Sequence, residues 1–264
     1  MSKTVLMIHG MASGQWAWDN YRSVFEAAGY HCVAVTLPFH NSDPTADAHP
    51  KLGTASLLDY AAALEQQIRA LPERPILIGH SMGGLLAQML AARGLAQASV
   101  LITPAPPAGI LALTPSVLKT FSPIIGRWNF WKKPFRFPQK TAEYAILNRL
   151  SPAQQATEYA QFVPESGRAA FEIGYWIIDR KKATQVDAKQ VDCPMLVVGA
   201  TDDRITPVSV VKQVAKKYPT ATYRQYNQHA HMIMVEKGWQ SVAQRTGVDA
   251  KTRLTHPATS SSTA

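Results

Sequence analysis

Six short apolar runs, each bounded by turn residues, constrain the fold of this 264-residue chain more than any other feature. Helix-patterned stretches lie between them, near 16–28, 56–71, 82–93 and 207–218. Near-continuous Val, Ile and Leu strands that alternate with helices are typical of a parallel sheet covered by helices on both faces. The sequence therefore predicts an α/β fold with about six mostly parallel strands. We expect these at TVLMI (4–8), HCVAVT (31–36), PILIG (75–79), ASVLIT (98–103), PMLVVG (194–199) and ATYRQY (221–226).

The alternation of strands and helices breaks between residues 104 and 193. This stretch opens with TPAPPAG, is rich in aromatic residues and has the pattern of several short helices. An insertion of about 90 residues is far longer than an ordinary connection in such a fold. We therefore expect a core in two parts, 1–104 and 191–247, and an inserted helical cap at 105–190. The small and polar C-terminal residues predict a disordered tail over 248–264.

Composition excludes several classes of protein. Hydrophobic residues make up 46% and charged residues 17% of the chain, which indicates a globular protein. No apolar run approaches the ~20 residues that span a bilayer, and we expect no signal peptide. The net charge of +9 comes mainly from scattered basic residues without a nucleic-acid-binding motif, so we expect no nucleic-acid partner. Cys32 and Cys193 lie in apolar runs, which favours two buried free thiols over a disulfide or a metal site and suits a reducing cytoplasm.

The heptapeptide IGHSMGG, residues 78–84, carries the clearest chemical signal. It follows a buried-type strand and opens a helix, and Gly79 to Gly83 fit the G-x-S-x-G motif. In that motif a serine occupies a tight turn between strand and helix, where a glycine avoids the clash of a Cβ atom. The N-terminus of the helix directs N–H groups and partial positive charge toward an oxyanion. Ser81 is therefore the candidate nucleophile.

A nucleophilic serine needs a base, and the base needs an orienting acid. ATDDRITP (200–207) follows the fifth predicted strand, and NQHAHMIMVEKGW (227–239) follows the sixth. Both segments come just after the carboxyl ends of strands, where open parallel sheets build their sites. The first offers Asp202 and Asp203 as the acid, and the second offers His229 and His231 as the base.

These motifs resemble the α/β-hydrolase superfamily of the serine esterase and lipase type, over residues 4–247. Members often carry D-x-x-x-P after the penultimate strand, which selects Asp203 over Asp202 here. They also carry a histidine followed five residues later by an acidic residue, and His231 with Glu236 fits that spacing. The resemblance thus implies a catalytic triad of Ser81, Asp203 and His231. His229 is then a loop histidine, and Glu236 is expected to start the last helix.

The loop after the first strand supplies the second oxyanion donor in this superfamily. His9-Gly10-Met11 looks like the family's HG segment, so the resemblance implies an oxyanion hole of the backbone N–H groups of Met11 and Met82. His9 is expected to hold that loop together, and His80 is expected to be a packing residue. Where relatives often show D-x-x-G-x-G, this chain has TLPFHN (36–41), which we interpret as a structural loop.

Locally the chain resembles the methylesterase and hydroxynitrile-lyase branch of the superfamily. The stretch HGMASGQWAW and the H-M-x-M at His231 carry this likeness. The lyases of that branch place Thr where Gly10 stands and Lys where Met232 stands, so this chain has the esterase version at both positions. The resemblance implies no organic cofactor and no metal.

The resulting functional hypothesis is a serine hydrolase that cleaves carboxylic esters of hydrophobic or lipid-like small molecules. The same constellation supports other chemistry, since fold alone does not fix the reaction. A C–C bond hydrolase, a lactonase and a cofactor-free lyase or peroxidase therefore stay open as alternatives. A non-catalytic ligand-binding module is the third class of hypothesis, which the complete triad disfavours.

The predicted cap contains one basic and aromatic stretch, RWNFWKKPFRFPQK, residues 127–140. Such a surface suits weak contact with anionic lipid or an amphipathic ester. Alternatively its aromatic side chains pack the cap over the core, which we favour, while Lys and Arg face water. In FVPESGR (162–168) we expect Glu165 and Arg168 to pair with each other rather than to contact the substrate.

Overall fold

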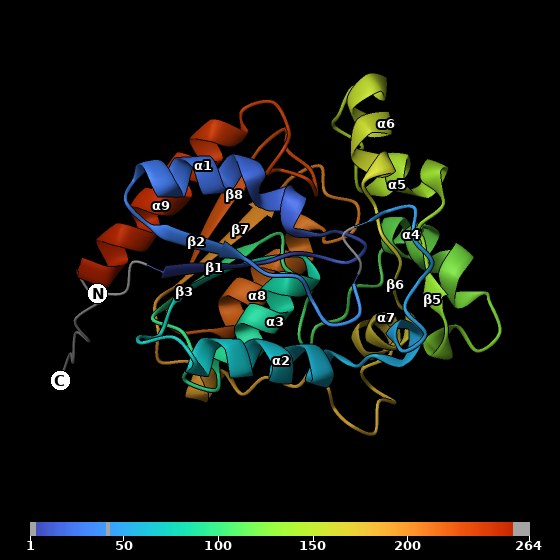
Figure 1. Ribbon diagram of the computed structural model, residues 1–264, viewed down its shortest axis with the longest axis horizontal. Helices are drawn as coiled ribbons and strands as arrows, with labels where there is room; N and C mark the ends of the chain where they lie inside the picture. Colours follow the sequence, from blue (N-terminus) through green and yellow to red (C-terminus); the bar gives the residue numbers. More distant parts are fainter. Residues whose placement is uncertain (1–3, 41–42, 256–264) are drawn as a thin grey trace.

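A six-stranded, entirely parallel sheet forms the centre of the structure, a computed structural model that describes residues 4–40 and 43–255 (Figure 1). The strand order is β2-β1-β3-β4-β7-β8. The strands are β1 (Thr4–Ile8), β2 (His31–Ala34), β3 (Ile76–His80), β4 (Ala98–Ile102), β7 (Met195–Ala200) and β8 (Ala221–Tyr226). All six predicted strands are present, and the α/β fold class predicted from the sequence is confirmed.

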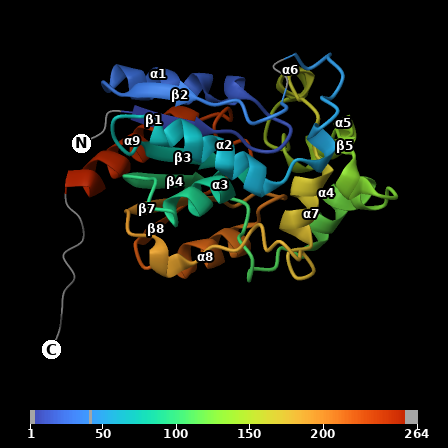
Figure 2. The same cartoon turned by 60° about the horizontal axis from the view of Figure 1, so that its bottom comes forward.

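Helices cover both faces of this sheet, as its apolar strands require (Figures 1 and 2). On one face lie α1 (Asp19–Ala27), preceded by the 3₁₀ turn η1 (Gln15–Trp18), and α9 (Trp239–Thr255). On the other lie α2 (Leu57–Arg69), α3 (Met82–Ala91) and α8 (Val208–Lys217). Successive strand residues point to opposite faces, so Val5 and Met7 join the first core while Leu6 and Ile8 join the second.

The chain between β4 and β7, here called the inserted segment, folds into several short helices. These are α4 (Pro115–Ile125), α5 (Gln139–Ala145), α6 (Pro152–Ala160) and α7 (Gly167–Gly174), with the 3₁₀ turns η3 (Phe130–Lys132) and η4 (Ala188–Gln190). A two-stranded antiparallel ribbon joins β5 (Pro134–Phe135) to β6 (Glu165–Ser166), and η2 (Leu52–Thr54) packs against it. A third apolar cluster unites this segment with Ala12 and Met232, which follow β1 and β8. The inserted segment therefore lies over the carboxyl ends of the strands.

The aromatic stretch 127–140 mainly packs the inserted segment. Phe130, Phe135 and Phe137 are buried in the third apolar cluster, and Trp131 packs against it. Trp128 is the exception, with 81% of its surface exposed. Packing, the alternative favoured from the sequence, therefore describes four of the five aromatic side chains.

The C-terminal helix runs further than the sequence suggested. We expected a disordered tail from residue 248, but α9 continues to Thr255. No proline interrupts residues 239–255, so nothing in the backbone stops the helix there. The remaining tail residues, 256–264, lie outside the described residues.

Two further observations concern the described part of the chain. None of its helices combines the length and the apolar character needed to cross a membrane. Both cysteines are free, as predicted, although Cys32 is only half-buried. Burial raises the pKa of the Cys193 thiol to about 12 and that of Cys32 to about 11, so both remain protonated at neutral pH.

Candidate active site

Ser81 forms the turn between β3 and α3. β3 ends at His80 and α3 begins at Met82, so a single residue joins the strand to the helix. Ser81 has φ 53° and ψ −119°, a conformation that residues other than glycine rarely adopt. Its N–H donates to the carbonyl of Ile102 at 3.0 Å, and its carbonyl accepts from Gly84 at 2.9 Å. The strained turn is therefore held on both sides, and it presents the hydroxyl at the end of the sheet.

Two glycines allow α3 to pass close to the strands. A Cβ atom on Gly83 would collide with the carbonyl oxygens of Ile8 and His9 at the end of β1. A Cβ atom on Gly79 would collide with the carbonyl of Gly83. Only a hydrogen atom fits at either position, so both glycines of the G-x-S-x-G motif have a steric reason.

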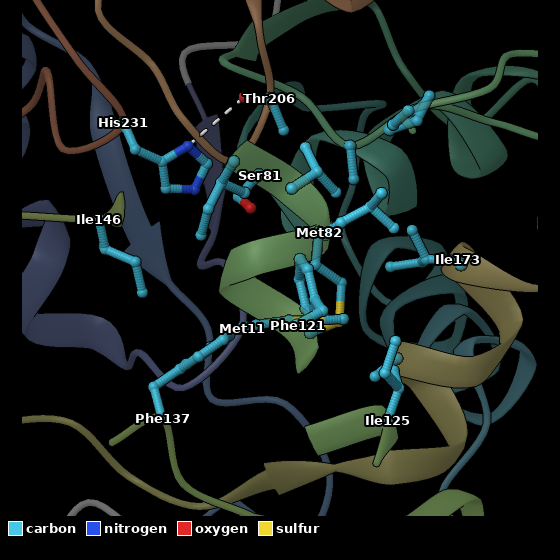
Figure 3. Close-up of a pocket in the computed structure, with 18 of the residues that line it drawn as sticks. Met11, Ser81, Met82, Phe121, Ile125, Phe137, Ile146, Ile173, Thr206 and His231 are labelled. Atoms are coloured by element: carbon cyan, nitrogen blue, oxygen red, sulfur yellow. Dashed lines mark hydrogen bonds between the residues drawn. The ribbon is translucent and has the colours of Figure 1, made fainter. Parts of the chain in front are cut away.

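Asp203 and His231 lie together, and His231 lines the same cavity as Ser81. Asp203 follows β7 and His231 follows β8, and His231 Nδ1 lies 2.8 Å from Asp203 Oδ2. A carboxylate accepts hydrogen bonds, so Nδ1 donates in this contact, and in the neutral ring that tautomer leaves the lone pair on Nε2. Figure 3 shows the imidazole of His231 next to Ser81 at the cavity. The arrangement can supply a nucleophile, a base and an orienting acid.

Thr206 also belongs to this cluster, although the sequence analysis did not single it out. Its N–H donates to Asp203 Oδ1 at 2.8 Å, as does that of Ile205. Its hydroxyl lies 2.8 Å from Asp203 Oδ2 and 3.4 Å from His231 Nδ1, the contact dashed in Figure 3. Thr206 thus fixes the carboxylate that orients the histidine. Its place three residues after Asp203, in the D-x-x-x-P segment, is a signal that could have identified it.

The other candidate acid and base have partners elsewhere. Asp202 is partly exposed and pairs with Arg149 at 3.4 Å. His229 Nδ1 lies 3.0 Å from Glu236 Oε2. Neither Asp202 nor His229 lines the cavity that contains Ser81.

Glu236 has a different position from the one predicted. We expected it to start the last helix, but α9 begins at Trp239. Glu236 is buried, and its carboxylate accepts the N–H of Ala230 at 2.9 Å as well as the contact from His229. Burial raises the pKa of Glu236 above its ordinary value. Its carboxylate therefore holds the loop that presents His231.

His80 contacts both the backbone and the ring of His231. Its Nε2 donates to the carbonyl of His231 at 2.9 Å, and the two rings lie 4.7 Å apart between centroids. Burial lowers the pKa of His80 well below its ordinary value, and repulsion from the His231 ring in its protonated form adds to this effect. His80 is therefore a neutral residue that packs against His231 and also anchors its backbone.

The loop after β1 brings Met11 to the same cavity as Ser81 and Met82. His9 holds this loop, since its Nδ1 donates to the carbonyl of Gly10 at 2.9 Å and its Nε2 accepts from the N–H of Leu37 at 3.3 Å. Burial lowers the pKa of His9 to about 4, so the ring is neutral and can make both bonds.

The cavity above Ser81 is about 190 Å³ in volume and mostly apolar (Figure 3). Its floor is formed by the ends of the strands, and its wall comes from the inserted segment, including Phe121, Ile125, Phe137, Ile146 and Ile173. Within the described residues, no group of three or more His, Cys, Asp or Glu side chains could hold a metal ion. The cavity therefore suits an apolar small molecule that places a reactive group at Ser81.

Glu165 and Arg168 do not pair with each other, so that prediction was wrong. Arg168 lies at the start of α7 and pairs with Glu172 one turn later, at 2.8 Å, and with Asp179 at 3.2 Å. Glu165 lies on β6, is completely buried, and meets His40 Nε2 at 3.1 Å. His40 comes from the loop 36–41 that we interpreted as structural; Asn41 lies outside the described residues.

Comparison with known proteins places the chain in a family. The sequence pattern of the Alpha/beta hydrolase family matches residues 5–245. The chain belongs to this family. Methylesterase 3 of Arabidopsis thaliana is 32% identical over 87 residues, which is 32% of each chain. The alpha-hydroxynitrile lyase of the same plant is 29% identical over 82 residues, 30% of each chain. The match therefore spans about a third of the length of these curated relatives.

Solved structures of the Alpha/beta hydrolase family have the same fold. An extracellular alpha/beta-hydrolase from a Paenibacillus species gives a TM-score of 0.71 at 18% identity, covering 94% of this chain and 98% of that one. The monoacylglycerol lipase of Paleococcus ferrophilus gives 0.70 at 20% identity, covering 96% and 94%. The resemblance to the superfamily and its methylesterase branch, found from sequence motifs, is confirmed, and esterases are among the relatives.

The close approach at Gly83 leads to a stability prediction. We expect Gly83→Ala to destabilise the protein by roughly 2–4 kcal/mol, because the new methyl group must push α3 away from the end of β1. Gly174→Ala is the control, since nothing lies within 4 Å of a Cβ there. Urea unfolding followed by circular dichroism measures both variants. Equal unfolding midpoints for the two variants would contradict the steric argument.

Proposed function

We propose that this alpha/beta hydrolase is a serine hydrolase that cleaves carboxylic esters of hydrophobic small molecules. The contact of Asp203 with His231, which lines the same apolar cavity as Ser81, carries this proposal. Ser81 is the nucleophile, His231 the general base and Asp203 the orienting acid. The N–H groups of Met11 and Met82 form the oxyanion hole.

The reaction follows from the protonation state of the pair. His231 Nε2 takes the proton of the Ser81 hydroxyl as its oxygen attacks the ester carbonyl, and Asp203 stabilises the resulting imidazolium. The N–H groups of Met11 and Met82 stabilise the tetrahedral oxyanion, each by about 3 kcal/mol in comparable sites. His231 then protonates the leaving alcohol, and water releases the acid from Ser81 by the same steps.

Ester hydrolysis is favoured over the lyase alternative by two positions. A Cβ atom on Gly10 would lie 2.9 Å from the Cβ of Ser81, so the threonine found in the lyases has no room here without a shift. Met232, where the lyases carry lysine, is buried in the third apolar cluster. Neither position therefore offers the polar side chain that the lyase branch places beside its nucleophile.

The inserted segment supports a proposal on substrate choice. We propose that residues 105–190 form a cap over a core made of 1–104 and 191–247, and that this cap selects the substrate. Its apolar side chains line the cavity above Ser81, which favours medium-length or aromatic esters over charged ones.

Contact with lipid is a further part of this proposal. Among the described residues, the strongly exposed large hydrophobic side chains are Leu111, Leu113, Leu118, Trp128, Ile177 and Ile178. The three leucines line the cavity, and the two isoleucines directly follow Trp176, which lines it as well. Exposed basic residues adjoin them in sequence at Lys119 and Arg180–Lys182. An apolar rim with neighbouring positive charge is suited to contact with an anionic lipid surface. A lipid-like ester would enter the cavity from that surface.

The free thiols of Cys32 and Cys193 support a reducing compartment. We propose the cytoplasm as the location of the protein.

The triad is tested by three substitutions. We expect Ser81→Ala and His231→Ala each to lower kcat for p-nitrophenyl butyrate by about 10⁴-fold or more, because triad members act as a unit. His229→Ala is the matched control and should keep at least about a tenth of kcat, since its partner is Glu236. Circular dichroism confirms that the variants are folded. Equal losses in the two histidine variants would refute the assignment of His231.

The proposed pocket is tested by narrowing it. We expect Ile173→Trp to lower kcat/KM for p-nitrophenyl octanoate at least about tenfold relative to the acetate, because the larger ring occupies space for a long acyl chain. Phe171→Trp, two positions earlier on α7 and outside the cavity lining, is the control. An unchanged chain-length profile in folded Ile173→Trp would show that the acyl chain binds elsewhere.

Lipid contact is tested with vesicles that contain phosphatidylglycerol. The wild-type protein should sediment with them, and replacing both Ile177 and Ile178 by Ser should reduce the bound fraction several-fold, because the rim loses apolar area. Trp128→Ser is compared, since Trp128 is exposed but does not line the cavity. Loss of binding in Trp128→Ser alone would show that the stretch 127–140, and not the apolar rim, contacts lipid. If the wild-type protein does not sediment with the vesicles, the proposed lipid contact is refuted.

A further inference from the structure

Ala12, the residue after Met11, is held at both of its backbone groups by the inserted segment. Its N–H donates to Glu165 Oε2 at 3.2 Å, and its carbonyl accepts the N–H of Val163 at 3.1 Å. Ala12 has φ 56°, a left-handed conformation that is unfavourable for alanine and needs such support. Residues 163–165 therefore fix the chain immediately after the proposed oxyanion donor.

Two peptide groups determine where the N–H of Met11 points. The Gly10–Met11 peptide carries that N–H, and His9 Nδ1 holds its carbonyl end at 2.9 Å. The next peptide, Met11–Ala12, is held at its N–H end by Glu165. Because a peptide group is planar, a hydrogen bond to each of the two groups limits the rotation of both planes and so restricts the backbone angles of Met11. His9 and Glu165 thus clamp the donor from opposite sides.

The carboxylate of Glu165 is surrounded by donors. Besides Ala12 and His40, it meets the hydroxyl of Tyr60 at 3.1 Å and the N–H of Ser166 at 2.7 Å. Burial by itself raises the pKa of Glu165, but the charge of His40 and the hydrogen bond from it outweigh this, so the pKa is lowered. Glu165 is therefore an anion with two donors on each oxygen.

His40 supplies the matching cation. Its Nε2 faces Glu165, and its Nδ1 lies 3.2 Å from the carbonyl of Pro38, which only accepts. Both ring nitrogens therefore donate, which requires the imidazolium form. Burial alone lowers the pKa of His40, yet the charge of Glu165 and its hydrogen bond raise it above the ordinary value. The other titratable groups that face the pair are neutral His9, 5.3 Å from His40 between ring centroids, and Tyr60, at 5.6 Å.

We propose that Glu165, held as an anion by His40, is a positioning residue that aligns the Met11 N–H of the oxyanion hole. This rests on the proposed function, in which that N–H stabilises the tetrahedral oxyanion. The alignment matters only in the transition state, so its loss lowers kcat and leaves KM nearly unchanged. The loop 36–41 gains a role by the same contact, because it carries the counter-ion.

Glu165→Gln is the direct test. Glutamine keeps the size of the side chain, but its NH₂ group cannot accept, so one pair of donors loses its partner. We expect kcat for p-nitrophenyl acetate to fall about 10- to 100-fold with KM changed less than about threefold. The expected fall in kcat is smaller than the fall caused by removing an oxyanion donor, because Val163 and His9 still hold the loop.

Glu172→Gln is the matched control. Glu172 is another fully buried glutamate of the inserted segment, and it binds the Ser56 hydroxyl and the Leu57 N–H, each at 2.8 Å, at the start of α2. It therefore ties the same segment to the core without touching residues 9–12. We expect this variant to lose stability but to keep kcat within about threefold. Equal losses of kcat in the two variants, both folded, would reduce Glu165 to a structural role and overturn the inference.

The pH profile gives a second readout. The pKa of His40 is raised, so the ion pair is intact at neutral pH. It is lost as the pH rises through the raised pKa of His40. On the acid side it is lost as the pH falls through the lowered pKa of Glu165. We expect wild-type kcat to show a decline at alkaline pH that is absent in Glu165→Gln. His40→Gln should behave like Glu165→Gln, and the double variant should lose little more. Identical alkaline profiles for wild type and Glu165→Gln would contradict the role of the ion pair.

Failure of this inference and failure of the proposed function give different results. If Ser81→Ala keeps full activity, the serine mechanism itself is wrong. If Ser81→Ala is inactive while folded Glu165→Gln keeps wild-type kcat, the mechanism stands and Glu165 does not align the oxyanion hole.

Discussion

The close packing of α3 against the end of β1 is the constraint on which the site depends. Gly83 lies against the carbonyl of Ile8, and a side chain there would separate helix from strand. Because the helix starts so near the sheet, only Ser81 remains to connect β3 to α3, and it adopts a strained conformation. The same packing points the N-terminus of α3 at the cavity, where its N–H groups and partial charge favour an oxyanion. The strained turn at Ser81 and the N–H groups that point at the cavity are thus consequences of one steric contact.

Features with a local physical cause could be predicted from the sequence. The strands are apolar because both faces of the sheet are covered, so a run such as PILIG is recognisable without a structure. Ser81 is marked by the glycines on either side, and Asp203 and His231 follow strands whose carboxyl ends share one edge of the sheet. In the structure, the two partners chosen from sequence motifs meet at 2.8 Å.

Features that depend on distant residues could not be predicted in this way. His40 and Glu165 are 125 positions apart, and no local pattern pairs a histidine in a proline-containing loop with a glutamate before a helix. The expected Glu165–Arg168 pair was wrong because helix geometry gives Arg168 a nearer partner in Glu172. The prediction that Glu236 starts the last helix was also wrong. Its carboxylate accepts the backbone N–H of Ala230 in the loop before the helix, a contact that sequence spacing does not reveal. Buried charges follow the tertiary structure, and sequence spacing alone does not reveal their partners.

The two buried glutamates of the inserted segment tie one part of that segment to the core. Removing a donor of Glu165 or Glu172 from the folded protein would leave a buried carboxylate incompletely paired, at a cost of several kcal/mol. By contrast, α6 has no buried residues. The α4 side of the cavity carries three exposed leucines at or near its rim, Leu111, Leu113 and Leu118. Substitutions at these exposed leucines are therefore expected to cost little stability, whereas substitutions that leave Glu165 or Glu172 unpaired are expected to cost much more. The inserted segment thus has one part that buried carboxylates hold to the core and another part whose surface can vary at little cost in stability.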